Sequence, residues 1–175
     1  MKTIRKLNHR KLACLLALSA VTIALAAPAT FADLRKVEQT VYGMDCAPCA
    51  YGVEKGIGKL DGVQRVKVSL NDGTAVVELA EANEIGIADI RQVVSDGGFT
   101  PKQARVEIAG TLAREDGKLQ LMTGGGTGYR LAKGAGAEDV WKQLQTTQNN
   151  TRLVLEGIVP ADDAALLEVE SLSAV

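Results

Sequence analysis

The chain has very little of the residue types that many enzyme active sites use. Its 175 residues include one histidine, three cysteines and 3% aromatic residues. The histidine is His9, in an N-terminal segment with the features of a cleaved leader. The rest of the chain therefore cannot form a Ser–His or Cys–His nucleophilic pair, and its carboxylates show no pairing that would suggest a hydrolase. The sequence predicts a protein that is not an enzyme.

The chain also lacks a hydrophobic run of the roughly 20 residues needed to cross a bilayer comfortably. Residues 1–32 instead have the order of a secretory signal peptide: five basic residues, an apolar stretch over 12–27, and small residues ending at Ala29 and Ala32. We expect cleavage after Ala32, with Ala29 as an alternative site, and export to the periplasm. An uncleaved membrane anchor is the lesser alternative.

A basic surface is missing as well. Cleavage after Ala32 removes five of the 20 basic residues and none of the 21 acidic ones, so the formal net charge changes from −1 to −6. Proteins that bind nucleic acid or anionic lipid usually carry a basic surface. The sequence therefore predicts no nucleic-acid partner.

The pattern of apolar residues over 33–108 predicts the order strand, helix, strand, strand, helix, strand. The first helix is expected from about Ala47 to Leu60, and an Asp72-Gly73 turn joins the second and third strands. Gly97-Gly98 ends the second helix. This βαββαβ order is the ferredoxin-like arrangement. The expected strands are 36–42, 63–70, 74–79 and 100–108.

Residues 109–175 have a different pattern and predict a second domain. Short strands are expected at 104–112, 118–122, 129–132, 152–159 and 166–169, with a helix at 137–144 between the third and the fourth strand. This order is typical of a small OB-like β-barrel. The expected fold class is thus α+β, a ferredoxin-like domain followed by an OB-like barrel. The last strand of the first domain and the first strand of the second fall in one stretch, which would hold the domains in a fixed relation.

The motif Gly43-Met44-Asp45-Cys46-Ala47-Pro48-Cys49 contains both cysteines that remain after residue 32. Two thiols separated by two residues, where a loop enters a helix, can converge on one centre. Such a pair suits either a soft metal ion or a reversible disulfide. The helix N-terminus favours the negatively charged thiolates that metal binding needs.

The residues around the cysteines resemble the heavy-metal-associated domain family, found in metallochaperones, periplasmic mercury-binding proteins and metal-pumping ATPases. The resemblance implies that Cys46 and Cys49 bind one soft metal ion per chain. It also implies that Met44 packs in the core and that Phe99 lies near the loop. The ion would pass by ligand exchange to a metal-transporting membrane protein or another thiol-bearing partner. The matching residues are Gly43-Met44-x-Cys46-x-x-Cys49-Ala50, Val53-Glu54, Leu60-x-Gly62-Val63 and Gly97-Gly98-Phe99-Thr100-Pro101.

Asp45 bears on which ion is bound. Two thiolates suit Cu(I) or Hg(II), whereas Zn(II) or Cd(II) takes further ligands, and a carboxylate can be one of them. An acidic residue directly before the first cysteine resembles the domains of zinc-, cadmium- and lead-exporting pumps. Asp45 is therefore a candidate third metal ligand, with a solvated loop residue as the alternative. Two other functions remain open: thiol redox or redox sensing by the same cysteines, and a metal-responsive adaptor that binds a protein through the barrel.

Overall fold

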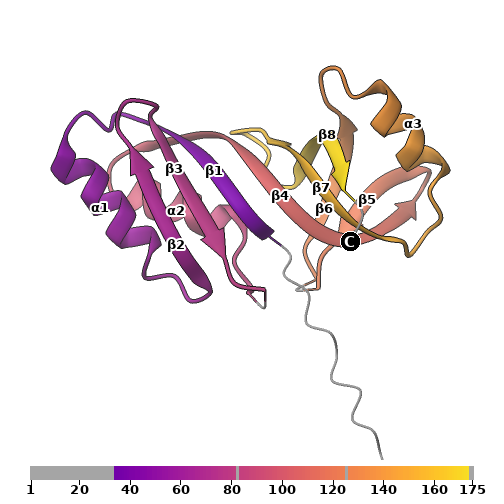
Figure 1. The fold of residues 1–175 in the computed structure, drawn as a ribbon, viewed down its shortest axis with the longest axis horizontal. Coiled ribbons are helices and arrows are strands. Elements are labelled where there is room, and N and C mark those ends of the chain that lie inside the picture. The colour runs from indigo at the N-terminus through magenta and orange to yellow at the C-terminus, as the bar shows by residue number, and fades with distance from the viewer. Residues whose placement is uncertain (1–33, 82, 125, 174–175) are drawn as a thin grey trace, which may run out of the picture.

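The computed structural model describes residues 34–81, 83–124 and 126–173 (Figure 1). The expected signal peptide lies outside these residues. No helix within the three ranges has the length and apolar character needed to cross a membrane. The elements in chain order are β1 (Leu34–Tyr42), α1 (Ala47–Ile57), β2 (Val63–Ser69), β3 (Thr74–Leu79), α2 (Ile87–Asp96), β4 (Thr100–Glu115), β5 (Lys118–Met122), β6 (Gly128–Lys133), α3 (Glu138–Thr146), β7 (Arg152–Val159) and β8 (Leu166–Ser173).

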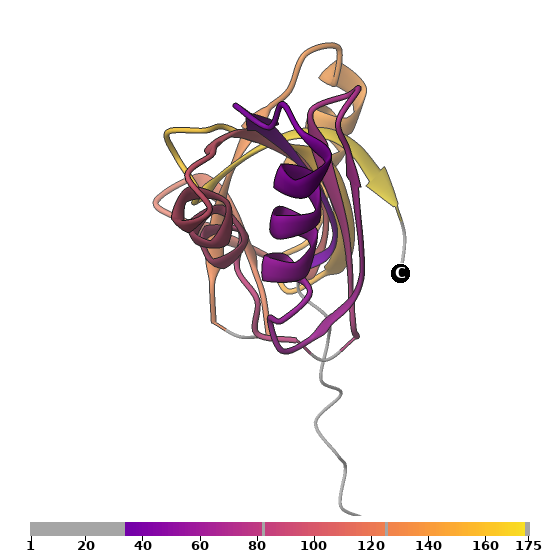
Figure 2. The ribbon, with the colours of Figure 1, turned by 90° about the vertical axis from the view of Figure 1, so that its left-hand side faces the viewer.

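The N-terminal half has the predicted βαββαβ order. Its strands pair antiparallel in the order β2-β3-β1-β4. Helices α1 and α2 pack against each other and against these strands, and Figure 2 shows the two helices side by side. Their apolar faces meet the apolar side of the sheet, which removes this surface from water. The fully buried side chains here include Val37, Val77, Ile57, Ile90 and Val94.

Several predicted boundaries differ from the structure by a few residues, among them the ends of α1 and β2. Helix α1 ends at Ile57, before the expected Leu60, because the backbone after Gly58 turns more tightly than an α-helix does. The amides of Lys59 and Leu60 donate to carbonyls three residues earlier, at Gly56 and Ile57. Leu60 still packs against the core, but it does so from a turn. Strand β2 ends at Ser69, so Leu70 lies in the turn and is 38% exposed.

The C-terminal half is a closed five-stranded barrel. Its strands follow the order β4-β5-β6-β8-β7, and pairing between β4 and β7 closes the ring. Strands β6 and β8 are parallel, whereas the other neighbours are antiparallel. Helix α3 connects β6 to β7 and packs against β8. The expected number of strands and the expected place of the helix are confirmed.

Strand β4 belongs to both halves. Over residues 104–108 it pairs with β1 along one edge and with β7 along the other. From Thr111 to Glu115 the edge that faced β1 pairs with β5 instead. Ala104, Val106 and Ile108 are buried in a core that continues from one half into the other. The expected boundary between residues 108 and 109 therefore falls inside one continuous strand.

Two glycines allow the barrel strands to approach one another closely. A Cβ added at Gly110 would lie 2.8 Å from the carbonyl oxygen of Met122, and one added at Gly157 would lie 2.2 Å from that of Glu168. Real side chains do not fit at such distances, so only glycine serves at these positions. Gly157 also lies at a register shift between β7 and β8, where the strand bends.

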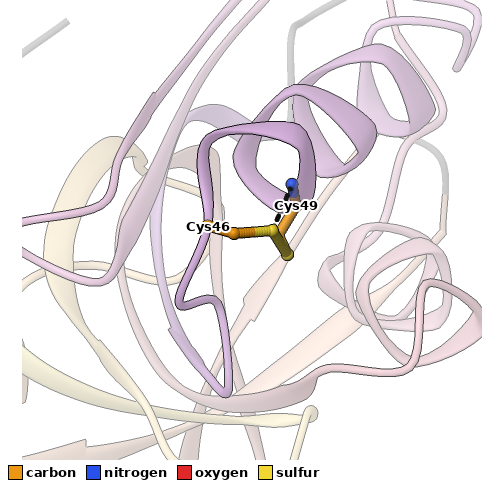
Figure 3. Close-up of a disulfide and its surroundings, with 2 residues drawn as sticks. All are labelled: Cys46 and Cys49. Atoms are coloured by element: carbon orange, nitrogen blue, oxygen red, sulfur yellow. Dashed lines mark hydrogen bonds between the residues drawn. A yellow bond between two sulfur atoms is a disulfide. The ribbon is translucent and has the colours of Figure 1, made fainter.

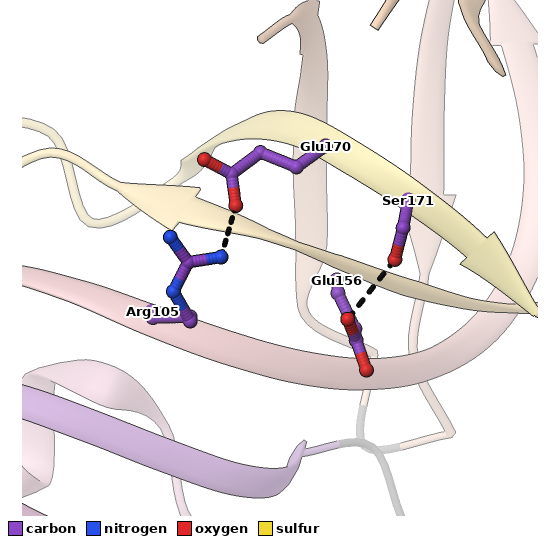
Figure 4. Close-up of polar contacts among 4 residues, drawn as sticks. All are labelled: Arg105, Glu156, Glu170 and Ser171. Carbon is purple, nitrogen blue, oxygen red and sulfur yellow. Dashed lines mark hydrogen bonds and ion pairs between the residues drawn. The ribbon is translucent and has the colours of Figure 1, made fainter. Parts of the chain in front are cut away.

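The outer face of the barrel carries polar side chains that connect its strands (Figure 4). Arg105 of β4 forms an ion pair with Glu170 of β8. Next to it, the hydroxyl of Ser171 donates to Glu156 of β7 at 3.0 Å. These contacts lie at the surface, where ion pairs contribute little to stability. They keep this face of the sheet hydrophilic.

A buried arginine joins α2 to the end of β7. Arg91 is 8% exposed, and its Nη2 donates to the carbonyl of Val159 at 3.0 Å. Its Nε donates at 3.3 Å to Oε1 of Gln39, which is itself fully buried. Gln39 in turn donates to the carbonyl of Lys102 at 2.8 Å. Burial lowers the pKa of Arg91, but an arginine stays charged at ordinary pH. The Arg91 side chain thus links the N-terminal βαββαβ half to the barrel.

We predict that Arg91→Met destabilises the protein more than loss of a surface arginine does. The substitution removes the donor to the buried Oε1 of Gln39 and one donor to the carbonyl of Val159, so the free energy of unfolding should fall by about 2–3 kcal/mol. Arg35→Gln is the control, because Arg35 forms a surface ion pair with Glu107 at 3.6 Å. This substitution should lower the free energy of unfolding by less than about 1 kcal/mol. Urea denaturation measures both. Equal losses in the two variants would contradict a structural role for Arg91.

Candidate metal-binding site

A short loop between β1 and α1 carries the cysteine motif. Gly43 has φ +88°, a left-handed conformation that glycine adopts without strain. The turn directs Met44 inward, where it is 5% exposed and packs with the core, as the family resemblance implied. Asp45 and Cys46 follow on the exposed side of the loop. The buried methionine therefore anchors a loop whose tip faces water.

Cys46 caps the N-terminus of α1. It has an extended backbone, with φ −141° and ψ 151°, and its Sγ accepts a hydrogen bond from the Cys49 amide at 3.2 Å. Pro48 fits in the first turn because its missing N–H would have no partner within the helix. Sequence and backbone thus place the first sulfur at the positive end of the helix dipole, which favours a thiolate once the cysteine is reduced.

The two sulfurs meet at this helix end. Cys46 and Cys49 form a disulfide, with their Cα atoms 5.1 Å apart (Figure 3). Cys46 is exposed, whereas Cys49 is half-buried and packs against the core. The first turn of α1 contains no acidic residue that would repel thiolates. After reduction, the same geometry offers two soft donors to a single ion, and one of them faces solvent.

Asp45, the third predicted ligand, is not grouped with the two sulfurs in the structure. Across 34–81, 83–124 and 126–173, no three His, Cys, Asp or Glu side chains are grouped closely enough to hold a metal ion. Asp45 itself is exposed beside Cys46 in the sequence. Its role as a third ligand stays a prediction, and Cys46 and Cys49 are the two predicted ligands that the structure brings together.

Aromatic side chains surround the loop. Phe99 is half-buried, and its ring lies 4.0 Å from the position of a Cβ at Gly43, close to the loop as expected. Tyr51 is 61% exposed, with the Lys55 Nζ 5.4 Å from the centre of its ring. Tyr42, which the sequence patterns did not single out, is 60% exposed and has the Lys102 Nζ 4.9 Å from its ring centre. Alternation along β1 could have found it, because its neighbour Val41 points inward.

The heavy-metal-associated domain family matches residues 39–100 of the chain. Copper chaperone CopZ of Enterococcus hirae is 38% identical over 64 residues, which make up 37% of this chain and 91% of that protein. Copper chaperone CopZ of Bacillus subtilis is 37% identical over 59 residues, 34% of this chain and 84% of that protein. The chain therefore belongs to the heavy-metal-associated domain family.

Other similarities are of comparable extent. The chain is 41% identical over 59 residues to human copper-transporting ATPase 2, but these residues span only 4% of that protein. A crystal structure of a copper-binding domain from a P-type ATPase is 32% identical, covers 41% of this chain and 92% of its own, and has a TM-score of 0.36. The family match ends at residue 100, where β4 begins, so it does not include the barrel.

We predict that Met44 supports the loop without binding metal. Met44→Leu conserves volume in the core, so the free energy of unfolding should change by less than about 1.5 kcal/mol and metal stoichiometry should be unchanged. Met44→Ala leaves a cavity and should cost about 2–5 kcal/mol. Urea denaturation and metal titration of both variants test this. A Met44→Leu protein that folds normally but no longer binds the ion would show instead that the thioether is a ligand.

Proposed function

We propose that this protein is an exported carrier of a soft metal ion rather than an enzyme. It captures the ion between Cys46 and Cys49 and passes it to a thiol-bearing partner. The observation that carries the proposal is the meeting of two sulfurs at an exposed helix N-terminus within a heavy-metal-associated domain. Export rests on the signal-peptide pattern of residues 1–32, which leads to the periplasm.

Transfer needs little movement in this geometry. The disulfide must first be reduced, because the disulfide and the metal complex use the same sulfurs. A thiol reductant supplies the two electrons and two protons and is itself oxidised to a disulfide. The ion then binds two thiolates, and the two thiol protons pass to solvent. A partner thiolate can add to the ion from the solvent side, beside the exposed Cys46, before the bonds to this chain break. Such an exchange through shared ligands requires no catalytic base.

Cu(I) is the ion that we propose for the site, one per chain. Two thiolates without a third grouped ligand suit a soft ion of low coordination number. The relatives named CopZ are copper chaperones, which favours copper over the other ions. Hg(II) shares the same two-sulfur preference. Zn(II) or Cd(II) would need further ligands, and Asp45 is the candidate for one of them.

We propose a metal-transporting ATPase, or another thiol-bearing protein of the same compartment, as the partner. Copper-transporting ATPases are among the proteins that resemble part of this chain. The barrel is proposed to be OB-like. Its strand order, its single parallel pair and a helix between the third and the fourth strand support this assignment.

The main alternative is thiol redox or redox sensing by the same cysteines. The disulfide between Cys46 and Cys49 is the observation that favours it. In an oxidising compartment such a bond persists unless a reductant or a metal ion intervenes. A redox protein would cycle this disulfide with a partner and would bind metal no better than a protein that lacks both thiols.

An anaerobic titration of the reduced protein decides between these functions. We expect one Cu(I) per chain in competition with a chelator, and loss of this binding in Cys46→Ser/Cys49→Ser. The disulfide contributes little to the fold because the loop that it closes is short. The double variant should therefore stay folded by circular dichroism. If the reduced protein binds Cu(I), Hg(II) and Zn(II) no better than the double variant, metal carriage is wrong and thiol redox becomes the leading function.

We further predict that Asp45 affects the affinity for Zn(II) more than the affinity for Cu(I). Asp45→Asn removes the charge at constant size and should weaken Zn(II) binding about tenfold or more, the equivalent of one charge-assisted contact. Cu(I) affinity should change less than threefold because two thiolates suffice. Asp61→Asn, another exposed loop carboxylate, is the matched control and should leave both affinities unchanged. Equal Zn(II) affinity in the wild type and Asp45→Asn would show that Asp45 is only a solvated loop residue.

A further inference from the structure

A hollow of about 550 Å³ opens on the barrel between α3 and the strands β4–β6. Its lining includes Arg114, Lys118, Arg130, Leu119, Leu131 and Trp141. The volume lies within the usual range for sites that bind small molecules, about 300–1,000 Å³. Figure 1 shows α3 at one end of the long axis and α1, which carries the cysteines, at the other. The hollow is thus separate from the metal-binding site.

The charged lining of the hollow is entirely basic. Arg130 is neutralised by an ion pair with Asp163, and Arg130 holds the pKa of that carboxyl below its usual range. Arg114 instead donates to the carbonyls of Leu144 and Gln145 at 2.9 and 2.8 Å, at the C-terminal end of α3, and to Oδ1 of Asn149 at 3.2 Å. Within the described ranges, neither Arg114 nor Lys118 forms an ion pair with a carboxylate. In an acidic protein, this leaves Lys118 as the cationic group that an anion can contact directly, while Arg114, held by these oxygen acceptors, adds a positive charge that no carboxylate neutralises.

The remaining lining is apolar. Leu119 and Leu131 are buried side chains of β5 and β6, and Trp141 is half-buried on α3. Trp141 is the only tryptophan of the chain, and it packs against the core. A flat indole beside aliphatic side chains can accommodate an aromatic ring. Binding sites for small molecules commonly combine such an apolar wall with a few charged groups that fix orientation.

We propose that this hollow binds a small aromatic anion, a carboxylate or a phosphate. The ring lies against Trp141 and the two leucines, and the anionic group lies near Lys118 and Arg114. The site would give the barrel a ligand of its own, independent of the metal ion at the other end of the molecule. Because the interaction is partly electrostatic at an exposed rim, it should weaken as salt is added.

The test is a titration of the leaderless protein with phenyl phosphate, benzoate and the neutral benzyl alcohol. Trp141 fluorescence reports occupancy of the hollow directly, and ¹⁵N amide shifts give a second readout. We expect saturable changes with at least one of the two anions, weaker binding of benzyl alcohol, and shifts confined to Gly117–Leu119 and Trp141–Gln145. Comparison of phenyl phosphate with benzoate identifies which anionic group the site prefers.

Matched variants test whether the anion binds in the hollow. Lys118→Gln should raise the dissociation constant about two- to fivefold, as loss of one exposed charge contact does. Lys142→Gln is the control on the same helix as Trp141, because Lys142 is exposed and pairs with Asp139 at 3.6 Å. Cys46→Ser/Cys49→Ser should bind the anion like the wild type. No saturable response, shifts outside the hollow, or equal effects of the two lysine variants would overturn the proposal.

Discussion

The pairing of β4 with both β1 and β7 is the constraint on which the rest of the structure depends. It makes one 16-residue strand the last strand of the helix–sheet layer and the first strand of the barrel. The two halves consequently share backbone hydrogen bonds and a single core, and Arg91 adds a buried polar link between α2 and the end of β7. A flexible linker would have let the halves reorient freely; a shared strand does not.

This constraint leaves the cysteine loop as the exposed end of a rigid body. Met44 holds the loop from below, while the start of α1 presents Cys46 to solvent and keeps Cys49 against the core. The site therefore has two unequal sulfurs: one that a partner can reach and one that is fixed to the fold. Such an arrangement suits a protein that must bind an ion firmly and still release it to another thiol.

Local sequence signals predicted most elements because they depend on nearby residues. Alternating apolar residues predicted β2, the Asp72-Gly73 turn joined β2 to β3, and the Gly97-Gly98 pair marked the end of α2. The cysteine motif likewise predicted that two sulfurs converge at the start of α1, where Cys46 and Cys49 meet. Features that depend on long-range contacts were missed, since no local pattern reveals that Arg91 meets Val159 or that Lys102 approaches Tyr42. The end of α1 differed for a related reason, because Leu60 reaches the core without being helical.

The most direct test of the account is X-ray absorption spectroscopy of the reduced protein loaded with one equivalent of Cu(I). We predict two sulfur neighbours around the copper, without an oxygen or nitrogen ligand, and loss of this signal in Cys46→Ser/Cys49→Ser. Copper bound with oxygen or nitrogen neighbours, or an unchanged signal in the double-serine protein, would contradict a two-thiolate carrier site at the start of α1.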